Sequence, residues 1–151
     1  MQPGAYLTKP LIKICCVQSI AEARTVIKAG ASAIGLVSAM PSGPGVIDEA
    51  LIAEITSAVP APVETFLLTS EQIASRIIEQ HHICRTTTIQ LVDQVEVGEL
   101  VKLRQSLPDI RLVQVIHVVD YVSLLEASSV EPYVDAILLD SGNVKLEVKQ
   151  L

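Results

Sequence analysis

The chain has 151 residues, which is the size of one domain that buries roughly two-thirds of its unfolded surface. Half of the residues are hydrophobic, yet no apolar run approaches the ~20 residues needed to cross a bilayer, and the start lacks the features of a signal peptide. The net charge of −6, with three tyrosines and one phenylalanine as the only aromatic residues, argues against nucleic-acid binding. We therefore expect a cytoplasmic protein that binds neither membranes nor nucleic acid.

Short runs of β-branched and other apolar residues recur along nearly the whole chain, roughly every 20–30 residues. The runs are continuously apolar rather than alternating, as expected when helices cover a parallel sheet. Helical patterns separate them, so the chain reads as a series of strand–helix units without a linker. The six predicted strands are 11–16, 32–38, 63–69, 87–92, 111–119 and 135–141.

The predicted helices carry start and stop signals of varying quality. The first has a capping-box pattern of Ser19 and Glu22, and Gly30 marks its end. The second has Asp48 as its N-cap. We expect the third to begin with Thr69 and Gln72, the fourth with Asp93 and Glu96, and the fifth to cover 121–128. The sequence predicts a parallel α/β fold, either an open sheet or part of a barrel.

The cysteines and histidines give little sign of a disulfide or metal site. Three cysteines are an odd number, and Cys15 and Cys16 are adjacent, which does not fit a disulfide scaffold. Zinc ligands usually come in Cys or His pairs spaced two to four residues apart, which His81, His82 and Cys84 match poorly. We expect a surface histidine pair beside a buried thiol, and no metal.

Three stretches in the same order resemble phosphoribosylanthranilate isomerase, a family of tryptophan biosynthesis. "IKICCVQSIAEARTVIKAGASAIGLV" is similar to its Lys-Ile-Cys-Gly strand, acidic helix and Ala-Gly-Ala-Asp-Ala-Ile-Gly segment. "TIQLVD" is similar to its Val-Gln-Leu-His-Gly strand, and "AILLDSG" to its Leu-Leu-Asp strand. The likeness covers roughly residues 11–142.

The resemblance implies an eight-stranded (β/α)₈ barrel. Six strands fit in this chain, so we expect a single barrel-like domain over residues 1–151, incomplete at its C-terminus and without the last two strands that carry the phosphate-binding loops. Open strand edges invite association, so we expect a homo-oligomer or a partner that pairs with these edges.

The resemblance also implies a reaction, an Amadori rearrangement of a phosphorylated ribosylamine bearing anthranilate into a 1-amino-2-ketose, without metal or organic cofactor. Asp140 matches the family's acid, which protonates the sugar's ring oxygen, and Cys15 matches the base, which removes the C2 proton. Lys13 lies on the same strand face as Cys15, and Gln90 is retained as a polar group at the mouth, so both are candidate substrate-binding residues.

Each assignment has a simpler alternative. An unperturbed carboxyl is ionised at neutral pH, and Asp140 can instead cap a turn with Ser141 and Gly142. A free thiol such as Cys15 is usually a small buried hydrophobe.

The chain departs from the family at three places. Cys16 replaces a glycine, Val92 replaces a histidine, and residues 40–48 ("MPSGPGVID") lack a substrate-binding arginine. The last segment reads as a backbone nest for an anion or as a plain turn.

These departures lead us to expect weak or absent isomerase activity. A non-catalytic α/β module or assembly partner is the alternative. A flavodoxin-like domain is a third option, although the loop after the first strand lacks the glycines that cradle phosphate.

Overall fold

The computed structural model describes residues 9–141. They form one six-stranded sheet in which every neighbouring pair is parallel and the spatial order follows the chain, β1-β2-β3-β4-β5-β6. This arrangement confirms the predicted parallel (β/α) repeat. The strands are β1 (Lys13–Ile14), β2 (Ala33–Val37), β3 (Glu64–Thr69), β4 (Thr88–Leu91), β5 (Arg111–His117) and β6 (Ala136–Asp140).

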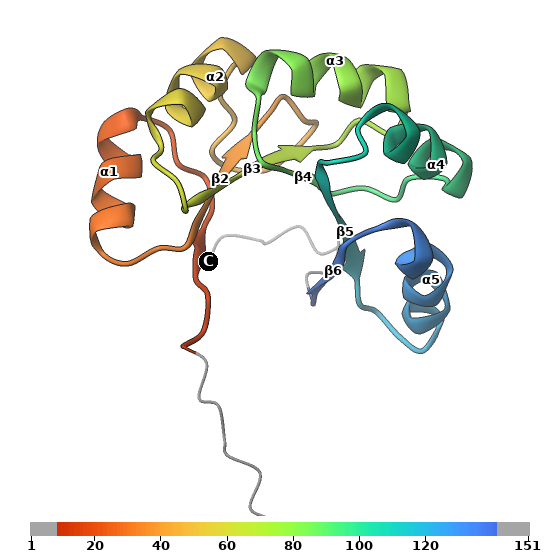
Figure 1. The fold of residues 1–151 in the computed structure, drawn as a ribbon. Helices are drawn as coiled ribbons and strands as arrows, with labels where there is room; N and C mark the ends of the chain where they lie inside the picture. The colour runs from red at the N-terminus through yellow and green to blue at the C-terminus, as the bar shows by residue number, and fades with distance from the viewer. Residues whose placement is uncertain (1–8, 142–151) are drawn as a thin grey trace, which may run out of the picture.

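The sheet curves, and all five α-helices lie along its convex side (Figure 1). Within residues 9–141 the strands line the concave side, so the described residues make a half-barrel. None of the helices within residues 9–141 is long and apolar enough to span a bilayer. The helices are α1 (Ile20–Lys28), α2 (Glu49–Ala58), α3 (Ala74–Cys84), α4 (Val97–Ser106) and α5 (Val122–Val130), followed by the short 3₁₀ helix η1 (Glu131–Tyr133).

The start and stop signals of the first two helices act as predicted. Ser19 Oγ accepts a hydrogen bond from Glu22 N at 3.1 Å, and the Glu22 carboxylate accepts one from Gln18 N at 2.7 Å. Asp48 Oδ1 accepts one from Leu51 N at 2.7 Å. Gly30 ends α1 with a φ of 104°, a conformation that glycine adopts without steric cost.

The predicted starts of α3 and α4 are wrong. Thr69 ends β3, where its buried hydroxyl donates to Gln80 Oε1 at 2.6 Å, and α3 begins five residues later. The Glu99 carboxylate of α4 accepts a hydrogen bond from Ala74 N at 2.7 Å, so a neighbouring helix caps α3. Glu96 is the N-cap residue of α4, but its side chain makes no capping bond.

Two apolar clusters hold the helices against the sheet. One packs α1 and α2 on β2 and β3, with Ile34, Ile52 and Leu67 fully buried. The other packs α3, α4 and α5 on β4, β5 and β6, with Ile89, Leu103 and Ile116 fully buried. Burying a side chain of this size contributes about 1.5–3 kcal/mol. Alternate residues of each strand therefore face the helices, and the others face the concave side.

The first strand is shorter than predicted. Only Lys13 and Ile14 pair with β2, opposite Ala33 and Ile34, and Leu11 is 86% exposed. The physical reason is its position at the edge of the sheet, where one neighbour instead of two fixes the backbone.

Candidate active site

The predicted acid and base both lie at the carboxyl ends of their strands. All strands are parallel, so their carboxyl ends meet at one rim of the half-barrel. Cys15 directly follows β1, two residues after Lys13, and Asp140 ends β6, four residues after Ala136. Lys13 and Ala136 both line the concave side, so the alternation of strand side chains places Cys15 and Asp140 on that side as well. Their strands are the first and last of the sheet.

A glycine on the neighbouring strand makes room for the Cys15 thiol. A Cβ added at Gly35 would lie 2.9 Å from Cys15 Sγ, closer than real Cβ atoms approach a neighbour, and 3.2 Å from Leu68 Cδ1, which is a tight contact. Cys15 itself is exposed and forms no disulfide. The thiol is therefore held against β2 while it remains accessible at the carboxyl rim.

Cys16 adopts the backbone shape that its position requires, despite its side chain. Its φ is 61°, in the left-handed region that costs a non-glycine residue about 1–2 kcal/mol. Cys16 Sγ lies 3.5 Å from the carbonyl oxygen of Pro44, to which it donates. The opposing Gly45 has a φ of 79°, and a Cβ there would lie 2.5 Å from Cys16 Cβ. The loop before α2 thus packs directly on the loop after β1.

That loop also leaves the rim without a cation after β2. Residues 40–48 contain no Lys or Arg. Val46 pairs with Val37 as an isolated parallel bridge, and Ile47 N donates to Val37 O at 2.9 Å, which ties the loop to the end of β2. Gly43 has a φ of 126°, so two left-handed glycines shape the segment.

Lys13 and Gln90 meet below the rim. The Lys13 ammonium donates to Gln90 Oε1, and it also stands 4.5 Å from the centre of the Phe66 ring. Gln90 is only 5% exposed. The two candidate binding residues therefore satisfy each other on the concave side, although 77 residues separate them in the chain.

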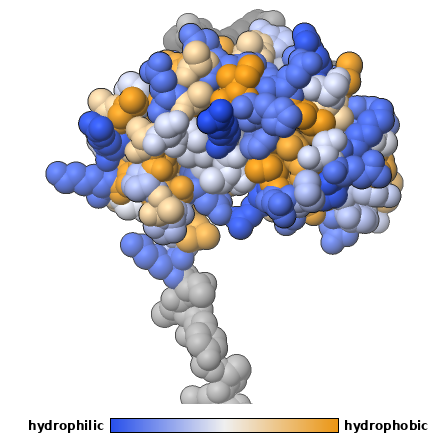
Figure 2. Space-filling model, turned by 45° about the horizontal axis from the view of Figure 1, so that its top comes forward, coloured by the Kyte–Doolittle hydropathy of each residue, from blue (hydrophilic) through white to orange (hydrophobic). Residues whose placement is uncertain are grey.

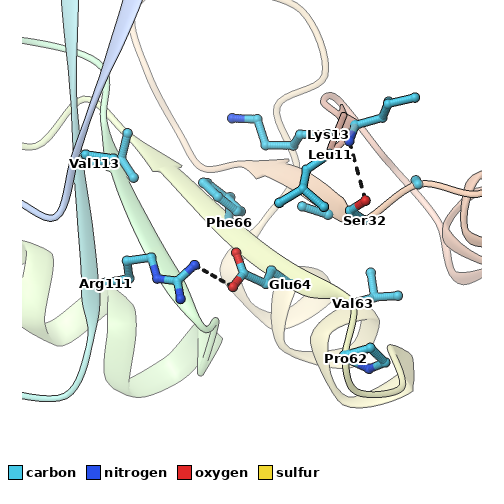
Figure 3. Close-up of a pocket in the computed structure, with 13 residues that line it drawn as sticks. Leu11, Lys13, Ser32, Pro62, Val63, Glu64, Phe66, Arg111 and Val113 are labelled. Carbon is cyan, nitrogen blue, oxygen red and sulfur yellow. Dashed lines mark hydrogen bonds and ion pairs between the residues drawn. The ribbon is translucent and has the colours of Figure 1, made fainter. Parts of the chain in front are cut away.

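A cavity of about 620 Å³ lies at the opposite end, among the amino ends of the strands. Figure 3 shows Arg111 and Glu64 directed towards each other within it, and their ion pair measures 2.6 Å. Lys13 lines this cavity, whereas Cys15, Gln90 and Asp140 do not. In closed barrels the amino ends of the strands contribute to stability, and the carboxyl ends carry the chemistry.

The sequence interpretation missed His117, the last residue of β5. Its Nε2 lies 3.0 Å from the carbonyl oxygen of Val92, and its Nδ1 lies 3.6 Å from Asp140 Oδ2. His117 and Asp140 are direct partners in the β5–β6 register. A histidine at the carboxyl end of a predicted strand, opposite a candidate acid, was the signal that could have identified it.

The remaining histidines and the third cysteine lie on α3. The expectation of a surface histidine pair is wrong for His81: His82 is exposed, but His81 is buried, and burial together with the neighbouring His82 lowers its pKa. Cys84 is buried, and burial followed by the charge of Glu49 raises its pKa to about 12. Among residues 9–141, no group of three or more His, Cys, Asp or Glu side chains could hold a metal ion. Gly142, the proposed partner of Asp140 in a turn, lies outside the described residues.

The chain is similar to curated phosphoribosylanthranilate isomerases. It is 28% identical over 131 residues to N-(5'-phosphoribosyl)anthranilate isomerase 2 of Methanosarcina mazei, covering 86% of this chain and 58% of that protein. It is 26% identical over 134 residues to the enzyme of Methanocella arvoryzae, covering 89% and 63%. The chain thus spans about three-fifths of the length of these relatives. No family model matches the sequence.

Solved structures of the same family share the fold. The phosphoribosylanthranilate isomerase of Thermotoga maritima superimposes with a TM-score of 0.79 at 18% identity, covering 90% of this chain and 63% of that one. A phosphoribosylanthranilate isomerase in complex with reduced 1-(o-carboxyphenylamino)-1-deoxyribulose 5-phosphate gives 0.75 at 20% identity, covering 86% and 64%. This chain is therefore similar in sequence and in fold to the phosphoribosylanthranilate isomerases.

Proposed function

We propose that this protein catalyses, at a low rate, the Amadori rearrangement of N-(5'-phosphoribosyl)anthranilate, a phosphorylated sugar. The observation that carries the proposal is the placement of Cys15 and Asp140 on the concave side of one rim, in a chain whose relatives are named for this activity.

In the proposed reaction, Asp140 donates a proton to the ring oxygen of the sugar. The C1–O bond breaks, the oxygen keeps the electron pair as a hydroxyl group, and the nitrogen lone pair forms a C1=N bond. Cys15 then removes the proton from C2, which gives an enol that rearranges to the ketone. Proton transfer by a positioned side chain contributes typically 10²–10⁴-fold to such a rate, and no metal or organic cofactor takes part.

Lys13 and Gln90 are proposed to hold the substrate from below. The Lys13 ammonium is the cation of β1 on the concave side, and the Gln90 amide provides both a donor and an acceptor. A bound substrate would have to exchange with the bond that these two side chains make with each other.

Turnover by the 151-residue chain is expected to be weak. The loop of residues 40–48 supplies no cation, and Cys16 places a side chain where close approach of a substrate favours glycine. Losing one preorganised electrostatic contact costs about 2.7–4 kcal/mol, or 10²–10³ in rate.

Loss of the fluorescence of phosphoribosylanthranilate tests the proposal. The purified chain should turn the substrate over slowly, and Asp140→Asn should lower kcat by at least about 100-fold, because the amide cannot donate an acidic proton. A wild-type chain without turnover above the uncatalysed rate would contradict the proposal and would favour a non-catalytic module.

We also propose that the chain is a single domain that associates through its open edges. Large apolar side chains are exposed near both edges of the sheet, Leu11, Ile12 and Ile14 beside β1, and Val119, Val122, Leu124, Leu125 and Leu139 beside β6. On the face seen in Figure 2, apolar patches lie between polar side chains. One solved structure from Thermotoga maritima is described as monomers generated from a dimeric phosphoribosylanthranilate isomerase.

Light scattering of the purified protein tests the association. A homo-oligomer is expected, because exposed apolar edge strands pair readily with a second chain. A Leu139→Lys variant should shift the protein towards the monomer, since it places a charge on the β6 edge, and a monodisperse wild-type monomer would contradict the proposal. The free thiols of the described cysteines fit a cytoplasmic location, which belongs to the same proposal.

A further inference from the structure

The imidazole of His117 stands between two neighbouring strands at the carboxyl rim. It comes from β5, and its two nitrogens face the residue after β4 on one side and the end of β6 on the other. The side chain is 31% exposed and Asp140 is 49% exposed, so both are reachable from the rim. Ser123 of α5 holds the backbone behind the ring, with Oγ 3.4 Å from the His117 carbonyl oxygen.

The contact with Val92 fixes the tautomer. A carbonyl oxygen only accepts hydrogen bonds, so Nε2 must carry a proton to bind Val92 O at 3.0 Å. In the neutral ring, Nδ1 is then a bare acceptor. Nδ1 is buried and has no hydrogen-bond partner among residues 9–141, and the Asp140 carboxyl oxygen lies 3.6 Å away. A small rotation of either side chain closes this distance, as catalytic hydrogen bonds often do when substrate binds.

We propose that His117 is a positioning residue for Asp140, which it holds at the rim through a proton shared between Nδ1 and Oδ2. The inference rests on the proposed function, because it takes Asp140 as the acid. Val92 stands where the resembled family has a histidine, and here its backbone carbonyl orients a histidine from the next strand.

The shared proton gives His117 a role in each catalytic cycle. Asp140 becomes a carboxylate when its proton passes to the ring oxygen, and the next cycle needs that carboxyl protonated again. The partly exposed ring of His117, with Nδ1 3.6 Å from Oδ2, is placed to return a proton of solvent origin to that carboxylate. The thiol returns the C2 proton to solvent, so the proton count closes over one turnover.

Imidazole ¹⁵N spectra test the pair without any need for activity. The chain has three histidines, and the resonances of His117 are those lost in His117→Gln. We expect the Nε2–H tautomer for His117, and we expect Asp140→Asn to move its Nδ1 resonance while those of His81 and His82 stay in place. An Nδ1–H tautomer, or His117 resonances unchanged by Asp140→Asn, would overturn the proposal.

Kinetics of His117→Gln test the role in the reaction. The glutamine amide can still donate to Val92 O, but it cannot exchange a proton with Asp140. We expect kcat to fall about 10–100-fold while KM changes less than about threefold, and His82→Gln on the exposed face of α3 should match the wild type. His117→Asn serves as a second variant if the glutamine chain does not fold.

The two proposals fail in different ways. A wild-type chain without turnover removes the proposed function, while the spectra still decide whether His117 and Asp140 share a proton. An active wild type with an equally active His117→Gln overturns the role of His117 and leaves the proposed function standing.

Discussion

At the amino ends of the strands, the concave side holds charges that neutralise each other, whereas at the carboxyl ends it holds the groups that we propose to exchange protons. Glu64 and Arg111 form a 2.6 Å ion pair in the cavity at the amino end. Cys15, His117 and Asp140 are partly exposed at the other rim. The difference indicates that substitutions at the amino end should change stability, and substitutions at the carboxyl rim should change chemistry.

The three thiols offer the largest contrast between the two ends. Cys15 is exposed at the carboxyl rim. Cys84 is the last residue of α3, near the amino ends of the strands, and burial and the charge of Glu49 raise its pKa to about 12. A thiol with that pKa carries roughly a thousandth of the thiolate of an ordinary thiol at neutral pH. The higher nucleophilicity of a high-pKa thiolate offsets part of this factor, so labelling with a chromogenic disulfide should modify Cys15 first, and Cys84 at least ~10-fold more slowly.

Denaturant and one variant complete the labelling experiment. Cys15→Ala should remove the fast phase, and unfolding in guanidinium should bring Cys84 to the rate of a free thiol. Rapid labelling of three thiols in the native protein would contradict the placement of Cys84.

Removal of the proposed base should affect activity strongly. Cys15→Ala should lower kcat for phosphoribosylanthranilate by at least about 100-fold, because no other thiol can reach C2 from the concave side of β1. Glu64→Gln is the matched control at the amino end, and its kcat should stay within about threefold of the wild type. Steady-state fluorescence measures both, and equal losses in the two variants would break the distinction between the ends.

The fold followed from local signals, and the site followed only in part. Ser19 and Asp48 cap their helices with bonds to the next turn, so sequence spacing was enough to predict them. The cap of α3 comes from Glu99 on another helix, which spacing within one helix cannot reveal. Thr69 was misread because its hydroxyl bonds Gln80 inside the fold.

The contacts of the site are mostly long-range. Lys13 of β1 contacts Gln90 of β4, and no sequence pattern near either residue predicts this contact. The pair of His117 and Asp140 was easier to predict, because the last residues of two neighbouring parallel strands lie side by side and their side chains point to the same face. The left-handed backbone at Cys16 agrees with the glycine that the family resemblance places there.

Gly45→Ala should destabilise the carboxyl rim without touching the acid or the base. The new Cβ would lie 2.5 Å from Cys16 Cβ, and its φ of 79° disfavours any side chain. Together these effects should cost about 2–3 kcal/mol of unfolding free energy. Urea denaturation measures the loss.

A double substitution isolates the share of the Cys16 side chain. In a Cys16→Gly background the contacts with Cβ and Sγ disappear, while the 2.9 Å contact with the Cα of residue 16 and the backbone strain at position 45 remain, so Gly45→Ala should cost about 1 kcal/mol less there. Equal costs in both backgrounds would show that the Cys16 side chain does not press on the loop that contains Gly45.

The smallest effect concerns Asp135, at the amino end of β6. Burial raises its pKa, but hydrogen bonds from Leu112 N at 2.8 Å and from Arg104 at 2.7 Å outweigh this, so the pKa is lowered overall. A lowered pKa stabilises the folded state at pH values above the unfolded-state pKa of about 3.9. This stabilisation is lost as the pH falls through the folded-state pKa. The carboxylate is 43% exposed and screened by solvent, so its share is below about 1 kcal/mol. Asp135→Asn should therefore flatten the acid limb of unfolding free energy against pH below about pH 4, measured by urea titrations. Asp109→Asn, at an exposed carboxylate shortly before β5, changes the net charge equally and should leave that limb as steep as in the wild type.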